Sequence, residues 1–220
     1  MRSITAAVGI GVAVGTKSTN SAADITSNVL GGVAVGLLLT GVLGVLAMTN
    51  EYTSGTIRAS MAAIPNRPLL LAGKAFVFAV ASLVVGEIAS FTAFFAGTAA
   101  LPNSIPAPSL STGAVLRAVV LSGTGFCLIG LIGLGLGAII RHTPAAVVVL
   151  VGGVYVGAQI VGAVSRTALA YIPVSLVANS LSTVHRLPRA LPPWAGLGML
   201  CLYAAVALGV GGWLLLWRDA

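Results

Sequence analysis

The chain has 220 residues, of which 58% are hydrophobic and only 7% are charged. Soluble domains carry roughly 25% charged residues, so this composition cannot cover a water-facing surface and excludes a soluble enzyme or soluble binding module. The formal net charge is +7, but the basic residues are scattered singly, which excludes the clustered basic face of a nucleic-acid-binding protein. The sequence therefore predicts a single transmembrane domain, residues 1–220, with lipid as its main solvent.

The first apolar run, Ser3–Thr16, is too short to be a full membrane span. It has 14 residues, whereas a spanning helix needs about 20. A signal peptide has an apolar core of similar length, but no small-residue cleavage site followed by a soluble protein is present. We therefore expect a short or truncated N-terminal span, followed by the polar stretch Lys17–Asn28.

Five longer apolar runs follow, and each is long enough to cross a bilayer. They are Val29–Met48, Leu69–Leu101, Ala118–Ile140, Ala145–Val164 and Trp194–Trp217. A tryptophan stands at each end of the last run, as is typical of side chains that anchor a span at the membrane interface. The runs predict an all-α fold, a polytopic transmembrane helical bundle with five full spans plus the short N-terminal one.

Glycines recur within these spans at spacings of three and four residues. The sets are Gly32, Gly36, Gly41 and Gly44 in one span, Gly130, Gly133 and Gly137 in another, and Gly153 with Gly157 in a third. Residues at such spacings share a helix face, and small side chains there let helix backbones approach closely in lipid. The alternative is background, because glycine is common in membrane helices.

The loop 50–68 is the most patterned polar stretch of the chain. Gly55 allows the backbone to turn sharply out of the preceding span. Ser54 or Thr56 can cap a short helix, and Pro65 would end that helix. The pattern predicts a short, charged helix parallel to the membrane surface, and the alternative is an ordinary interfacial connector.

Glu87 is the only acidic residue inside a predicted span. It lies 13 residues beyond Lys74, which is about 20 Å at helical rise. An intramembrane carboxylate is costly and often marks a proton or cation pathway. The alternative is a protonated or paired side chain that ties helices together through Ser90, Thr92 or a partner subunit.

The loop 165–193 contains a second helical pattern. Val177, Leu181 and Val184 recur at helical spacing after Pro173, with polar residues between them. This pattern predicts a short amphipathic helix in the headgroup layer.

No residue pattern points to catalysis, to a metal or to a cofactor. Cys127 and Cys201 both lie inside apolar runs and are best interpreted as free, small apolar side chains. His142 and His185 lie at helix ends or in loops, and neither has a catalytic partner nearby in sequence. We therefore expect no catalytic, cofactor-binding or metal site in this chain.

The residues around the loop 50–68 resemble a known family. An acidic residue, a Gly-Thr pair, a Pro-x-Arg turn and a Gly-Lys pair follow one another there. They are Glu51, Gly55, Thr56, Arg58, Pro65, Arg67, Gly73 and Lys74. In this order they resemble the permease subunits of bacterial type-2 ABC exporters, and the closing Arg218-Asp219-Ala220 is similar to the end of the small bacterial members.

The resemblance covers about Val29 to Ala220 and carries expectations about structure and function. It implies six spans per subunit, a homo- or heterodimer of permeases, and two cytosolic ABC ATPase subunits that hydrolyse the ATP. It also implies that the loop 50–68 carries a cytoplasmic coupling helix docked on the ATPase, and that the loop 165–193 lies outside the bacterial plasma membrane. Family members usually begin with a basic amphipathic helix and a complete first span, whereas this chain begins inside that region.

Two other functions remain open at this point. One is an ion-coupled secondary transporter or channel that uses Glu87, and the other is a non-transport membrane protein such as an immunity or assembly factor. The basic residues divide almost evenly between the two membrane sides, so the positive-inside rule does not fix the orientation. The resemblance alone places the loop 50–68 in the cytoplasm.

Overall fold

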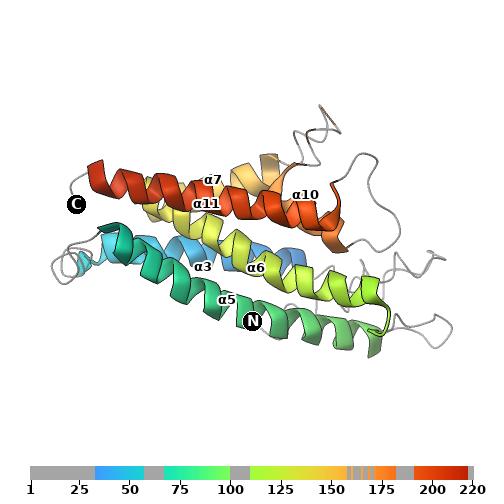
Figure 1. Ribbon diagram of the computed structural model, residues 1–220. Helices are drawn as coiled ribbons and strands as arrows, with labels where there is room; N and C mark the ends of the chain where they lie inside the picture. The colour runs from blue at the N-terminus through green and yellow to red at the C-terminus, as the bar shows by residue number, and fades with distance from the viewer. Residues whose placement is uncertain are drawn as a thin grey trace.

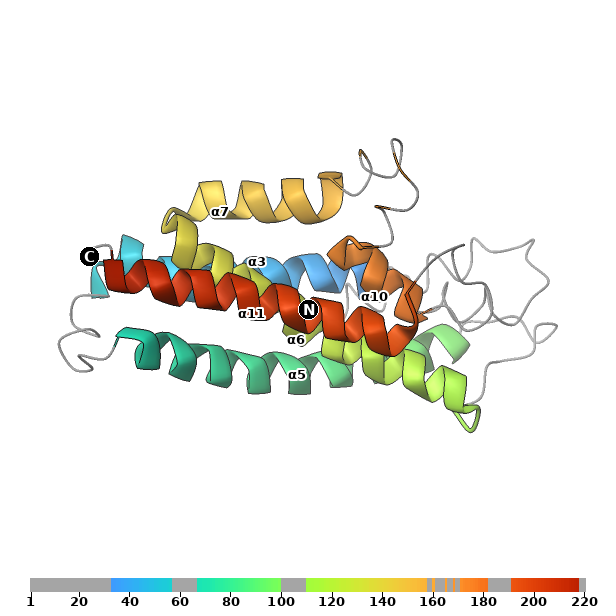
Figure 2. The same cartoon turned by 45° about the horizontal axis from the view of Figure 1, so that its top comes forward.

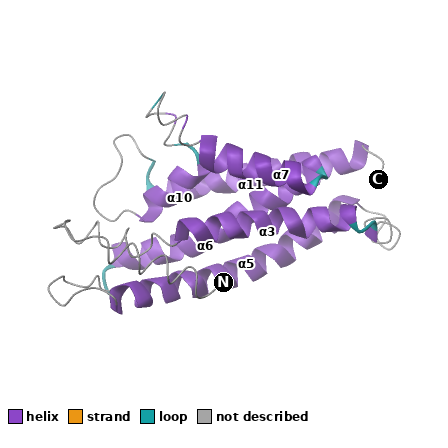
Figure 3. Ribbon diagram, turned by 180° about the vertical axis from the view of Figure 1, so that it is seen from behind, coloured by secondary structure: helices purple, strands orange, loops and turns teal. Residues whose placement is uncertain are grey.

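The computed structural model describes residues 33–56, 67–99, 110–157, 160, 165, 168, 171–181 and 191–217. All regular elements in this part of the chain are helices (Figure 3). In chain order they are α3 (Val33–Thr53), α5 (Arg67–Ala99), α6 (Gly113–Ile140), α7 (Thr143–Leu150), the π-helix η1 (Val151–Val156), α10 (Pro173–Leu181) and α11 (Pro193–Trp217). The predicted all-α class is confirmed.

Four of the described helices are long and apolar enough to cross a membrane. They comprise Val35–Thr53, Pro68–Ala99, Gly113–Ile140 and Pro193–Trp217. The chain is therefore compatible with a multi-pass membrane protein. Helix α5 has 33 residues and measures about 50 Å at helical rise, against about 30 Å for the hydrocarbon core, so it must tilt or protrude.

The predicted span Ala145–Val164 is only partly described by the structure. Helix α7 begins with Pro144 in its first turn, as helix starts prefer. The π-helix η1 then continues it through Gly152 and Gly153. Most positions from there to Val164 lie outside the described residues, as does the Ser3–Thr16 run. The described helices thus establish four candidate spans. The count of five full spans plus a short N-terminal one stays a prediction.

Helix α6 is the centre of the bundle (Figure 1). In its most apolar stretch 78% of the residues are buried, against 22% in the corresponding stretches of α5 and α11. Each of α3, α5 and α11 packs mainly on α6, and α3 and α5 hardly touch one another. Figure 2 shows α7 on the opposite side of α6 and α11 from α5.

Glycines bring α3 and α6 into backbone contact. A Cβ added at Gly44 would collide with the carbonyl oxygen of Gly130, and one added at Gly133 would collide with that of Gly41. The predicted close helix contact through glycines is therefore present. The two glycine faces make it with each other, a pairing that the sequence did not predict. Gly153 differs, because no heavy atom of the described residues lies within 4 Å of a Cβ built there.

The predicted amphipathic helix is present as α10. Leu176 and Val177 are buried against α6 and α11, and Val177 lies against Gly125 of α6. The apolar face of α10 therefore packs on the bundle, because this contact buries it more completely than a headgroup layer would. Val184 lies outside the described residues.

Candidate functional site

The end of α3 has the geometry that the sequence predicts for a sharp exit from the span. Helix α3 ends at Thr53, and Gly55 follows with φ of 71°, a left-handed conformation that glycine adopts without steric cost. The Ser54 hydroxyl donates a 2.7 Å hydrogen bond to the Asn50 carbonyl and lies 2.8 Å from the Thr56 hydroxyl. Ser54 thus closes α3.

The predicted loop 50–68 is shorter than expected at both ends. Helix α3 continues beyond the predicted span end, Met48, to Thr53, and α5 begins at Arg67 with a proline in its first turn. The extension is possible because the polar residues after Met48 keep helical hydrogen bonds and Glu51 finds a partner. The predicted coupling helix itself lies outside the described residues, together with Arg58 and Pro65.

Glu51 and Lys74 form an ion pair that joins α3 to α5. Their side chains are 27% and 23% exposed, respectively, and the paired atoms, Oε2 and Nζ, are shielded from solvent. The motif named both residues, but the sequence did not predict that they pair. The pairing follows from helix packing, because the two antiparallel helices place a carboxylate and an ammonium opposite each other.

Arg141 and Tyr52 extend this cluster to two more helices. The Arg141 guanidinium lies 5.3 Å from the centre of the Tyr52 ring, a cation–π distance. Its Nη2 donates a 3.3 Å hydrogen bond to the Leu214 carbonyl in the last turn of α11. Neither residue was predicted from the sequence to belong to the site. The available signal was the alternation of the predicted spans, which puts the turn after Ile140 on the same membrane side as the loop 50–68.

A small apolar layer lies beside this polar cluster at the same end of the bundle, which we call the loop-side end. It joins the four long helices through Met48, Leu71, Leu134, Ala138 and Leu215. Figure 1 shows the ends of α3 and α11 and the start of α5 gathered there. The loop-side end is therefore held by both apolar packing and charge.

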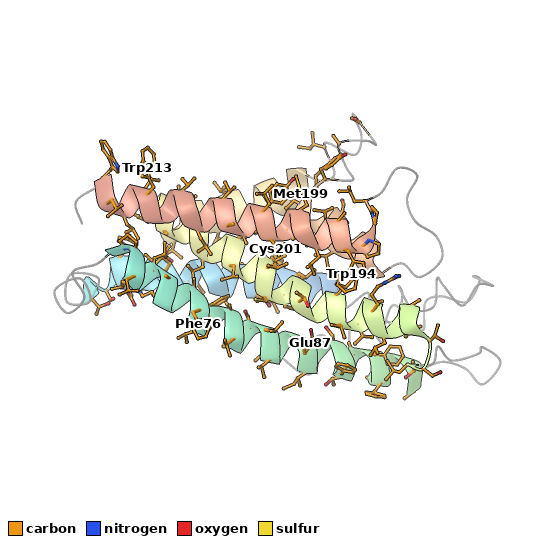
Figure 4. The ribbon with its side chains drawn as sticks, in the orientation of Figure 1. Phe76, Glu87, Trp194, Met199, Cys201 and Trp213 are labelled. Carbon is orange, nitrogen blue, oxygen red and sulfur yellow. The ribbon has the colours of Figure 1, made fainter. Side chains whose placement is uncertain are left out.

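Glu87 lies between α5 and α6 (Figure 4), with its carboxylate against Gly123. Ser90 bonds instead with Ser122 of α6, at 2.9 Å, and the Thr92 hydroxyl donates to a carbonyl of its own helix at 2.6 Å. Among the described residues, the Glu87 carboxylate has no hydrogen-bond or ion-pair partner. The predicted tie through Ser90 or Thr92 is therefore not made.

An apolar groove of about 370 Å³ lies between α3 and α5, with Phe126 of α6 among its lining residues. The hydroxyls of Thr40 and Ser82 in its wall donate to carbonyls of their own helices, at 2.9 and 2.6 Å. The walls can therefore hold apolar groups but offer no free polar group for chemistry. Lys74 lies one turn before Phe78 on the same face of α5, so the Glu51–Lys74 pair stands at the loop-side end of the groove.

The described residues offer no catalytic constellation. They contain no group of three or more His, Cys, Asp or Glu side chains that could hold a metal. Cys127 is buried and Cys201 is exposed, and both are free thiols. The charged side chains at the loop-side end hold the helices together. Among the described residues they do not form a group that could catalyse a reaction.

Comparison with protein-family models finds no match, and no curated protein matches the chain.

Proposed function

We propose that the chain is the membrane-spanning permease subunit of an ATP-driven exporter of the type-2 ABC family, passing substrate outward when a separate cytosolic ATPase subunit hydrolyses ATP. The observation that carries the proposal is the Glu51–Lys74 ion pair. It joins two residues of the motif that resembles this family. The loop between them contains the rest of the motif, apart from Arg67 and Gly73.

The pair explains how such a loop would act. A docking element transmits force only if both of its ends are fixed to the moving body. Glu51 and Lys74 fix the end of α3 to the start of α5, so a partner that displaces the loop must displace the two spans together. We assign the coupling role to Gly55, Thr56, Arg58, Pro65 and Arg67, and the anchoring role to the ion pair.

The proposal includes a second permease subunit and a complete set of spans. We propose that α7 and η1 begin the full span Ala145–Val164, and that Ser3–Thr16 is the short first span. No described residue lies against a Cβ built on Gly152 or Gly153, and Val148 is exposed; both support a subunit contact there, because small residues in lipid favour close helix packing.

One observation favours the ion-coupled alternative. The Glu87 carboxylate has no partner among the described residues, and an intramembrane acid is often functional. No second acid or histidine lies near it in the described helices, however, and the groove walls are apolar. We therefore retain ATP-driven export as the proposed function and test the alternative through Glu87 below.

Charge reversal tests the proposal. The chain is expressed with the ABC ATPase encoded by a neighbouring reading frame, and the ATPase recovered with it is measured. Glu51→Lys or Lys74→Glu alone is expected to lower recovery about ten-fold, because the loop loses its anchor and like charges oppose each other. The double reversal restores the pair and is expected to restore recovery.

The controls separate docking from folding. Each variant is first checked for membrane insertion and for a monodisperse profile in detergent. If the ATPase is never recovered with the unaltered chain, the permease assignment is wrong. If both single reversals leave recovery unchanged, the ion pair does not anchor a coupling loop.

A further inference from the structure

Arg141 adopts a backbone conformation that most side chains avoid. It ends α6 with φ of 59° and ψ of 6°, and its N–H donates a 2.9 Å hydrogen bond to the Gly137 carbonyl. Among the described residues it is the only non-glycine residue with positive φ. Glycine is the usual residue at this helix-end position, so an arginine there indicates that its side chain has a role.

The side chain of Arg141 reaches two other helices. Nη2 donates to the Leu214 carbonyl on α11, a group at a helix end where carbonyls lack intrahelical partners and attract positive charge. The same guanidinium lies over the Tyr52 ring on α3. One residue thus closes α6 with its backbone and contacts α3 and α11 with its side chain.

These contacts continue to the fourth long helix. Tyr52 adjoins Glu51, and Glu51 pairs with Lys74 on α5. A contiguous chain of contacts therefore runs from Lys74 through Glu51, Tyr52 and Arg141 to Leu214. It links the two helices that flank the loop to α11, which also contacts α5 directly.

We propose that Arg141 is the positioning residue that carries movement of the loop 54–66 to the end of α11. The inference rests on the proposed function, because the ATPase is what would move the loop. A push on the loop displaces α3 and α5 together through the ion pair, and Arg141 passes that displacement to α6 and α11 through contacts that are continuous in space.

The first measurement needs no ATPase. Amide hydrogen exchange is followed for the unaltered chain, Arg141→Gly and Arg141→Gln in lipid nanodiscs. Glycine suits the left-handed position, so Arg141→Gly keeps the helix end and removes only the side chain. Exchange in the last turns of α3 and α11 is expected to rise about ten-fold in both variants. Arg117→Gln, at the other end of α6, is the charge-matched control and leaves these turns unchanged.

The second measurement uses the full complex with the ATPase. Addition of ATP and vanadate is expected to change exchange in the last turn of α11 about three-fold in the unaltered complex and in Arg117→Gln. The ATPase is expected to co-purify normally with Arg141→Gly. The change in exchange at the α11 end on addition of ATP and vanadate is expected to be lost in this variant. Tyr52→Phe keeps the ring and the response, whereas Tyr52→Leu loses it.

Two results would overturn the inference. One is unchanged exchange of the α11 end in Arg141→Gly without the ATPase. The other is a nucleotide response that persists in Arg141→Gly with the ATPase bound. Absence of the ATPase from the unaltered complex would instead refute the proposed function, so the two failures are distinguishable.

Discussion

Shielded charged groups at the loop-side end are stable only in pairs. The paired atoms of Glu51 and Lys74 are covered, so neither charge can be solvated if its partner is removed. Exposed ion pairs contribute about 0.2–1 kcal/mol, whereas breaking a buried pair costs about 3–5 kcal/mol. Side chains about one-quarter exposed lie between these cases.

Removal of one partner of the ion pair is expected to destabilise the protein. Lys74→Met should lower the free energy of unfolding by about 2 kcal/mol, because it leaves the Glu51 carboxylate unpaired. Adding Glu51→Gln should recover most of that loss, because neither charge then remains. Unfolding in mixed micelles of increasing denaturing detergent measures both. Equal stability of Lys74→Met and the unaltered chain would show that the ion pair contributes nothing.

Glu87 provides a second prediction at this scale. Glu87→Gln should insert normally and retain ATP-driven export, because a neutral side chain of the same shape still fits against Gly123. Export of a fluorescent substrate panel from vesicles measures this, with Ser90→Ala as a control for the hydrogen bond to Ser122 on the same interface. A stably inserted Glu87→Gln variant that exports nothing would favour the ion-coupled alternative.

At the scale of the helices, glycine decides which pairs approach closely. Helix α6 lies against α3 where Gly130 and Gly133 face Gly44 and Gly41. Gly209 of α11 makes no such contact, since no described residue lies within 4 Å of a Cβ built there. A larger residue in place of glycine is therefore expected to disturb helix packing at some positions and not at others.

Matched substitutions test this difference. Gly133→Ala should lower the free energy of unfolding by about 1–3 kcal/mol, because the new methyl group collides with the Gly41 carbonyl and separates the helices. Gly209→Ala should be neutral or raise it by up to about 1 kcal/mol, because alanine favours the helix. Denaturing-detergent titrations compare the two. A loss in Gly209→Ala equal to that in Gly133→Ala would contradict the packing described.

The sequence predicted where the helices lie along the chain better than it predicted which helices pack against one another. Apolar length and glycine spacing located the four long helices and the packed glycine faces, because both signals are local. The central place of α6 was not predictable, since its composition resembles that of the other spans. The continuation of α3 to Thr53 was also missed, because it depends on Glu51 finding Lys74 across the loop.

At the scale of the whole molecule, the bundle has a loop-side end and an opposite end. Thr56 stands at the first and Thr112, just before α6, at the second, and both are exposed. The site was partly predictable at this scale. Glu51 and Lys74 were named from the motif, but Tyr52 and Arg141 are far apart in sequence, and only the packing of α3 on α6 brings them together.

The proposed orientation gives a labelling prediction. In a chain with Cys127 and Cys201 replaced by alanine, Thr56→Cys should react with an impermeant maleimide only in inside-out vesicles. Thr112→Cys should react only in intact spheroplasts, because the helices carry it to the other membrane face. Reaction of both positions from the same side would contradict the arrangement of spans, and the reverse pattern would place the loop outside.

Docking of the loop on an ABC ATPase is tested most directly by a site-specific cross-link from the loop itself. A photoreactive amino acid is placed at Thr56 and, as a control, at Thr112, and native membranes are irradiated. We expect that Thr56 alone yields an adduct whose partner is identified by mass spectrometry as an ABC ATPase with its nucleotide-binding motifs. An adduct with that ATPase from Thr112 but not from Thr56, or none from either position in membranes that contain the ATPase, would show that the loop does not dock on it.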